Sequence, residues 1–167
     1  MDALQAVIAA RELTENITPL NADCGRYCGG ACCQPDEDGQ GGMLLFPEEE
    51  KLYQPLPEGF ALTRDDSVTP GAHLLICSGF CDRRARPLSC RIFPLLPTEN
   101  GCRPDKRAWA VCPLMANGKS GMRKEFVQAV RKAGRILYAC PEHAAFLNAI
   151  HAYIASLDAA HQWLNNI

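Results

Sequence analysis

The most chemically informative feature of this 167-residue sequence is a run of four cysteines within ten residues. Cys24, Cys28, Cys32 and Cys33 are separated by gaps of three, three and zero residues, and glycines lie between them. Glycine permits the backbone conformations with φ > 0 that a chain needs when it wraps tightly around an ion. Backbone amides that come this close can also stabilise thiolate sulfur. The run therefore indicates a metal site.

A second group of cysteines follows after about forty residues. The two groups together supply eight thiols, enough for two four-thiolate sites or for one polynuclear site. Because buried thiolates repel one another, bound cations must offset most of their charge. The predicted metal ligands are Cys24, Cys28, Cys32, Cys33, Cys77, Cys81, Cys90 and Cys112.

Short motifs around these cysteines match a known family. They are the Cys32–Cys33 doublet, residues 44–49 (Leu-Leu-Phe-Pro-Glu-Glu) with Leu52 after them, the Cys77/Cys81 pair, residues 86–94 (Arg-Pro-Leu-Ser-Cys-Arg-Ile-Phe-Pro) and Cys112-Pro113. This pattern, which covers roughly residues 22–115, resembles the YkgJ-type cysteine-cluster family, described as zinc- or iron-chelating domains with eight cysteines. The family's first group usually has two-residue gaps, whereas this chain has three-residue gaps. The resemblance implies that Cys102 and Cys140 lie outside the family's eight ligands. We expect them to be structural, with substitution of either one as a ligand left open.

The predicted cofactor is an iron–sulfur cluster or zinc, and three observations favour iron–sulfur. The chain has no Cys-x2-Cys knuckle, which is common in zinc ribbons. Adjacent thiols at 32–33 serve two metals more readily than one. Cys-Pro occurs at Cys112 and Cys140, as it does at the end of ferredoxin motifs. Zinc remains open, because four thiolates also form a tetrahedral zinc site.

Four arginines crowd around Cys81 and Cys90. We expect them to offset thiolate charge and to hydrogen-bond nearby carbonyls, although they would also suit an anionic substrate or the carboxylate of a cofactor. Arg86 and Arg91 are the predicted cofactor-binding residues beside the thiolates, with Arg91 preferred because it adjoins Cys90. His73 is either an alternative ligand or an ordinary solvated or core histidine.

The sequence predicts a single domain over residues 1–167. It is expected to be small, α-rich, loop-rich and metal-bound, with an irregular cysteine-rich part packed on C-terminal helices and little or no β-sheet. Its predicted parts are an N-terminal helix within 1–20, a metal-binding part over 22–115 and a C-terminal helical hairpin over 120–167.

Individual elements follow from periodicity, caps and breakers. The expected elements are a helix over 2–16 with Leu4, Val7 and Ile8 on one face, a short helix over 47–53 that starts at Pro47, short strands over 73–77 and 108–112, and two helices with stripes at Met122, Phe126, Val130, Ala133 and Leu137 and at Phe146, Leu147, Ile150, Tyr153, Ile154 and Leu157. Residues 36–38 are expected to form a solvated turn, and His143, His151 and His161 are expected at the surface.

Composition and charge narrow the functional classes. A net charge of -2 gives no indication of nucleic-acid binding. No apolar run approaches the roughly 20 residues of a membrane span, and no basic leader precedes the first apolar stretch, so we expect a cytoplasmic protein. The predicted function is a metal chelator or carrier, or a redox or electron-transfer module, with metal ions as ligands and any protein partner unknown. Two alternatives stay open: an enzyme that uses the cluster, such as a methyltransferase-like protein, and a purely structural metal site.

Overall fold

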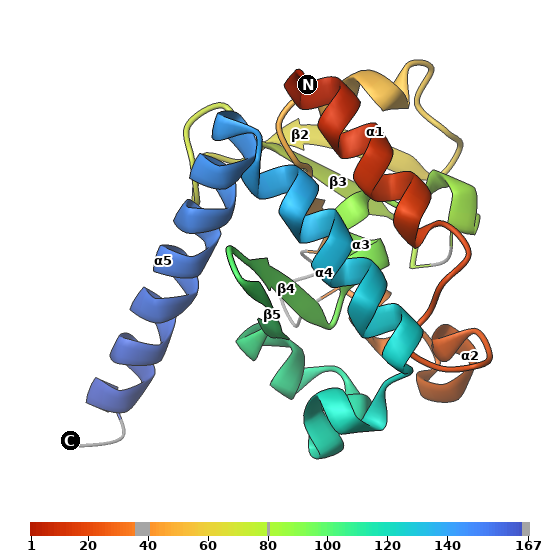
Figure 1. Ribbon diagram of the computed structural model, residues 1–167, viewed down its shortest axis with the longest axis vertical. Helices are drawn as coiled ribbons and strands as arrows, with labels where there is room; N and C mark the ends of the chain where they lie inside the picture. The colour runs from red at the N-terminus through yellow and green to blue at the C-terminus, as the bar shows by residue number, and fades with distance from the viewer. Residues whose placement is uncertain (36–40, 80, 165–167) are drawn as a thin grey trace.

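The computed structural model describes residues 1–35, 41–79 and 81–164, and Figure 1 shows their arrangement. The described α-helices are α1 (Ala3–Thr14), α2 (Cys24–Cys28), α3 (Leu88–Ile92), α4 (Lys124–Tyr138) and α5 (Pro141–Leu164). The described 3-10 helices are η1 (Ala31–Cys33), η2 (Glu49–Tyr53), η3 (Arg83–Ala85), η4 (Lys106–Ala110) and η5 (Pro113–Gly121). The predicted turn over 36–38 lies outside the described residues. No described helix is both long and apolar enough to cross a bilayer.

Two antiparallel sheets form within the described residues, so the prediction of little or no β-sheet is wrong. Their strands are β1 (Met43–Leu44), β2 (Phe60–Arg64), β3 (His73–Cys77), β4 (Leu95–Thr98) and β5 (Gly101–Pro104). The first sheet has the order β1-β3-β2, with Leu75 of β3 opposite both Met43 and Leu62. The second sheet is the β4–β5 hairpin. The fold is therefore mixed α and β, and only β3 lies where the sequence predicted a strand.

These strands were hard to predict because they are short and unfavourable in composition. β1 has two residues, and the others have four or five. Pro97 and Pro104 lie inside β4 and β5, where proline ordinarily argues against a strand. β2 does alternate, because Phe60 and Leu62 pack on a small core of Leu45, Tyr53 and Leu75 while Ala61 is exposed. Three alternating positions are too few to distinguish a strand from a loop.

Helix α4 lies at the centre of the main core. Figure 1 shows it beside α1 on one side, with the β4–β5 hairpin below it. The predicted stripe is confirmed: Phe126, Val130, Ala133 and Leu137 are all fully buried. A Cβ added at Gly134 would lie only 3.0 Å from Cβ of Pro97, so glycine allows α4 to press directly on β4.

Helix α1 exists as predicted, and Val7 and Leu4 of its predicted face do pack on the core, but small residues make up most of the buried face. Asp2 caps it by accepting the backbone N–H of Gln5 at 2.8 Å. The buried positions are Ala3, Ala6, Val7, Ala10 and Thr14. Ile8, predicted on the packed face, is 36% exposed. Small side chains allow α1 and α4 to approach closely. A prediction based on large apolar residues does not identify such a face.

Helix α5 continues the main core and then leaves it. Phe146, Leu147, Ile150 and Ile154 are buried, whereas Leu157 is 43% exposed. Figure 1 shows α5 turning back after Cys140 and diverging from α4 toward the C-terminus. The packing of α4 is mainly against α1 and the hairpin.

The prediction of a strand over 108–112 is wrong, because the first residues of this segment belong to the 3-10 helix η4. The buried carboxylate of Asp105 accepts the backbone N–H of Arg107 at 3.0 Å and starts the helix. The carbonyl of Ala108 then accepts the N–H of Cys112 at 2.8 Å. A capping aspartate therefore determines a turn where the apolar residues alone indicated a strand.

Candidate metal centre

The first cysteine group is presented by α2 and η1. Cys24 and Cys28 are the first and last residues of α2, one turn apart and on the same face of the helix. The Asp23 carboxylate starts this helix by accepting the N–H of Gly25 at 3.2 Å. Gly29 and Gly30 then both adopt left-handed conformations, with φ of 64° and 71°. These two residues reverse the chain and bring Cys32 and Cys33 back toward α2.

The second group is presented by elements far apart in the fold. Cys77 ends β3, and Cys81 follows in the loop that leads to η3. Cys90 lies in α3, and Cys112 immediately precedes η5. The order along the chain therefore says little about which thiols are neighbours.

One cavity of about 290 Å³ collects all of the predicted ligands. The cysteines that line it are Cys24, Cys28, Cys32, Cys33, Cys77, Cys81, Cys90 and Cys112. Much of the remaining wall is apolar, with side chains such as Met43, Phe60, Leu75 and Phe93. Such a wall lowers the local dielectric, which strengthens the electrostatic interactions of the thiols.

The other candidate ligands lie elsewhere. Among the described residues, neither Cys102 nor Cys140 lines this cavity, and both are buried in apolar clusters. The Cys140 thiol donates to a Glu142 carboxylate oxygen at 3.0 Å. His73 also lies outside the cavity, with Nδ1 3.9 Å from the Glu50 carboxylate.

The donor set suits zinc or an iron–sulfur cluster in its chemistry, since both are held by thiolates. Its geometry is open. Within residues 1–35, 41–79 and 81–164, no three Cys, His, Asp or Glu side chains gather closely enough to hold an ion. The thiols surround a common space, and metal binding would have to draw them together.

Arg86 acts to lower the pKa of three cavity thiols, those of Cys24, Cys33 and Cys81. A hydrogen bond from the Cys32 thiol is the main cause that lowers the pKa of Cys33 to about 6, and Arg86 adds to this against the effect of burial. The same bond raises the pKa of Cys32. Burial raises the pKa of Cys24 and Cys81, and Arg86 opposes it at both. The Nε atom of Arg86 is buried and has no hydrogen-bond partner among the described residues.

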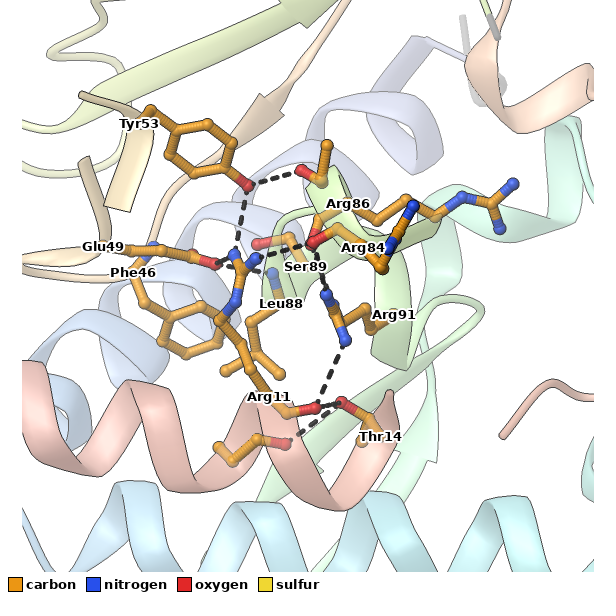
Figure 2. Close-up of polar contacts among 12 residues, drawn as sticks. Arg11, Thr14, Phe46, Glu49, Tyr53, Arg84, Arg86, Leu88, Ser89 and Arg91 are labelled. Atoms are coloured by element: carbon orange, nitrogen blue, oxygen red, sulfur yellow. Dashed lines mark hydrogen bonds and ion pairs between the residues drawn. The ribbon is translucent and has the colours of Figure 1, made fainter. Parts of the chain in front are cut away.

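Arg91 also borders the cavity, but its guanidinium is occupied by backbone carbonyls. It donates to the carbonyl oxygens of Arg86 at 2.8 Å, Arg84 at 2.9 Å and Arg11 at 3.4 Å (Figure 2). These contacts fix the loop from which the Arg86 side chain extends. Of the two predicted cofactor-binding arginines, Arg86 thus acts on the thiols, and Arg91 holds the loop.

Sequence reasoning missed a buried ion pair behind this loop. Glu49 is fully buried. Its Oε1 accepts Nη1 of Arg11 at 2.6 Å and the N–H of Leu88 at 2.7 Å, and its Oε2 accepts the N–H of Phe46 at 3.1 Å (Figure 2). Burial raises the pKa of Glu49, and Arg11 opposes this. The carboxylate thereby caps α3, the helix that carries Cys90.

The helix predicted over 47–53, starting at Pro47, differs in the structure. Glu48 adopts a left-handed conformation with φ of 67°, and the 3-10 helix η2 starts only at Glu49. Glu48 faces Lys51 at the surface, while Glu49 turns inward. The Leu-Phe-Pro-Glu-Glu motif indicated a short helix here, but it did not indicate which of the two glutamates is buried.

His143 was predicted at the surface, and this is wrong. It is fully buried, with Nε2 2.8 Å from the carbonyl oxygen of Ala3 and its ring against Phe46. Burial lowers its pKa. His151 is partly buried against Pro97, with Nε2 2.8 Å from that carbonyl, and the side chain of His161 lies outside the description. Neither His143 nor His151 borders the thiol cavity.

Comparison with known proteins finds no matching family model, no matching curated protein and no matching solved structure.

Proposed function

We propose that this protein binds metal through the eight cysteines of one cavity, as an iron–sulfur protein or a zinc protein. The observation that carries the proposal is the convergence of eight thiols from α2, η1, β3, α3 and the intervening loops on one space of about 290 Å³. Eight cysteine side chains around one cavity are far more than apolar packing requires. Thiolates are the preferred ligands of zinc and of iron–sulfur clusters.

The role that fits this site is metal transfer or electron transfer. Cys32 is exposed, and Tyr27 on the cavity wall is 71% exposed, so the thiols lie near the surface. A metal held there is open to exchange with, or electron transfer to, another molecule. The proposed location is the cytoplasm, a reducing compartment in which cysteines stay available as metal ligands.

Metal and sulfide analysis after anaerobic purification tests the proposal. A brown protein with iron and acid-labile sulfide would identify an iron–sulfur cluster. Colourless protein with bound zinc and no sulfide would identify a zinc site. Protein that is stable, metal-free and unable to take up either metal would refute the proposal.

Serine variants connect the metal to the cavity. Cys81→Ser removes a cavity thiol, and Cys140→Ser is the matched control, because it changes a buried cysteine outside the cavity. We expect the Cys81 variant to lose metal and the Cys140 variant to retain it. Equal metal content in the two variants would place the metal elsewhere.

A further inference from the structure

We infer that Tyr53 is a positioning residue for the metal centre, and that it holds the segment between Cys81 and Cys90 from outside the cavity. Among the described residues that line the cavity, Tyr53 is absent. Its hydroxyl contacts the backbone of the segment, and its ring packs with Leu75 of β3. The inference rests on the proposed function, because it concerns how firmly the same thiols hold a metal.

The segment from Cys81 to Cys90 consists of short elements that give it little stability of their own. The 3-10 helix η3 has three residues, and α3 has five. Helices of about one turn are unstable in isolation. Cys81, Cys90 and the intervening Arg86 nevertheless all border the cavity. Their positions therefore depend on contacts from other parts of the chain.

Three consecutive carbonyl groups in the middle of this segment accept side-chain donors (Figure 2). The carbonyls of Arg84 and Arg86 accept Nη2 and Nε of Arg91 at 2.9 and 2.8 Å. The carbonyl of Ala85, which lies between them, accepts the Tyr53 hydroxyl at 2.9 Å. Tyr53 comes from η2, 32 residues earlier in the chain, so this bond ties the segment to a separate element.

The direction of the Tyr53 hydrogen bond follows from its other partner. Nη1 of Arg11 lies 3.1 Å from the hydroxyl oxygen, and the Arg11 guanidinium lies 5.6 Å from the centre of the Tyr53 ring. A guanidinium can only donate, so the hydroxyl oxygen accepts and its own hydrogen is free for the Ala85 carbonyl. Glu49 holds Arg11 in this place by accepting the same Nη1 at 2.6 Å. The hydroxyl is thus directed at the segment before any metal binds.

The ring of Tyr53 supports a second part of the cavity wall. It is 3% exposed and belongs to the small apolar cluster with Leu45 and Leu75. Leu75 borders the cavity and lies two residues before Cys77 on β3. Tyr53→Phe separates the two contributions, because it keeps the ring on Leu75 and removes only the bond to Ala85.

The hydroxyl should slow the release of metal. The thiols surround an open space, so they must come together around a metal and separate again when it leaves. A bond that holds the Ala85 carbonyl in place opposes movement of the segment that carries Cys81 and Cys90. Loss of one hydrogen bond of this kind should accelerate metal release about fivefold.

Metal release from Tyr53→Phe, compared with Tyr138→Phe, tests the inference. Tyr138 is a partly buried tyrosine of α4 that packs on the main core and is not among the described residues that line the cavity. Each anaerobically purified protein is challenged with EDTA, and the metal that remains is measured by elemental analysis at intervals. We expect about fivefold faster release from Tyr53→Phe, and the wild-type rate from Tyr138→Phe.

Two further measurements separate positioning from general stabilisation. Visible circular dichroism of the metal-bound protein, with Co²⁺ in place of zinc if the protein is colourless, reports the arrangement of the thiolate ligands and should change in Tyr53→Phe alone. Urea unfolding of the metal-free proteins gives their stability. Reduced stability with a wild-type release rate and spectrum would overturn the inference, because the hydroxyl would then be merely structural.

Arg91→Lys provides a second variant on the same segment. One ammonium group cannot reproduce the bonds of the guanidinium to the carbonyls of Arg84 and Arg86, so release should again be faster than from the wild type. Faster release from Arg91→Lys but not from Tyr53→Phe would mean that Arg91 holds the segment alone, and the inference would be wrong. Absence of metal from the wild-type protein would instead refute the proposed function.

Discussion

Replacing Glu49 by glutamine should destabilise the protein severely, because the carboxylate is buried and serves three donors. It accepts the Arg11 guanidinium at 2.6 Å and the backbone N–H groups of Leu88 and Phe46 at 2.7 and 3.1 Å. A glutamine amide carries no charge, and its NH₂ would face one of these donors. Removing one partner of a buried ion pair typically costs about 3–5 kcal/mol. For a chain of this length, that corresponds to a fall of roughly 6–20 °C in the midpoint of thermal unfolding.

The neighbouring Glu48→Gln variant is the matched control. Glu48 pairs with Lys51 at the surface and makes no buried contact of this kind among the described residues, so its loss should hardly change the midpoint. Urea unfolding of both variants, monitored by circular dichroism, gives the two free energies. The double variant Arg11→Met with Glu49→Gln should lose less than the sum of the single variants. A cost for Glu49→Gln below about 1 kcal/mol, or additive single and double variants, would refute the buried ion pair.

Three further perturbations address other contacts. Burial lowers the pKa of His143 from 6.5, so below that pH the unfolded chain binds a proton more readily than the folded chain. The free energy of unfolding should therefore fall as the pH drops below 6.5, by up to about 1.4 kcal/mol per pH unit. Urea titrations at several pH values should show a weaker fall for His143→Gln. Gly134→Ala should lower the free energy of unfolding by about 1–2 kcal/mol despite the better helix propensity of alanine, because the new Cβ would meet the rigid Pro97 ring at 3.0 Å; a stabilised variant would contradict this close contact. Arg86→Gln should release metal to a chelator about tenfold faster than wild type, while exposed Arg84→Gln should not, and equal rates would show that Arg86 does not stabilise the thiolate site.

The sequence was most informative where one element determines its own structure. The spacing of Phe126, Val130 and Leu137 predicts a buried helical face from local periodicity alone, and that face is buried in α4. The eight cysteines predicted from residue type and spacing all border one cavity. Both inferences depend on residue type and spacing, which the sequence states directly.

Prediction failed where distant segments decide. The strand β2 is stabilised mainly by pairing with β3, and the pairing of Phe60 with Cys77 has no local signal. Glu49 and Glu48 are indistinguishable in the sequence until Arg11, 38 residues earlier, selects one of them for burial. The position of Cys90 at the cavity depends in the same way on a distant segment, because the Glu49 carboxylate accepts the N–H of Leu88 at the start of α3.

Removing the proposed metal should loosen the thiol cavity without unfolding the core. The main apolar cluster spans α1, α3, α4, α5 and the β4–β5 hairpin, and of the eight cavity cysteines, all of them described, Cys112 alone packs against it, from its edge. A purely structural metal that replaces a core would leave far less apolar burial than this. We therefore expect chelation under reducing conditions to preserve most of the helical circular dichroism, while amide exchange accelerates in segments 24–33 and 77–81. Cooperative loss of the α4 and α5 signals on chelation would mean that the metal, rather than the α1–α4 packing, holds the fold together.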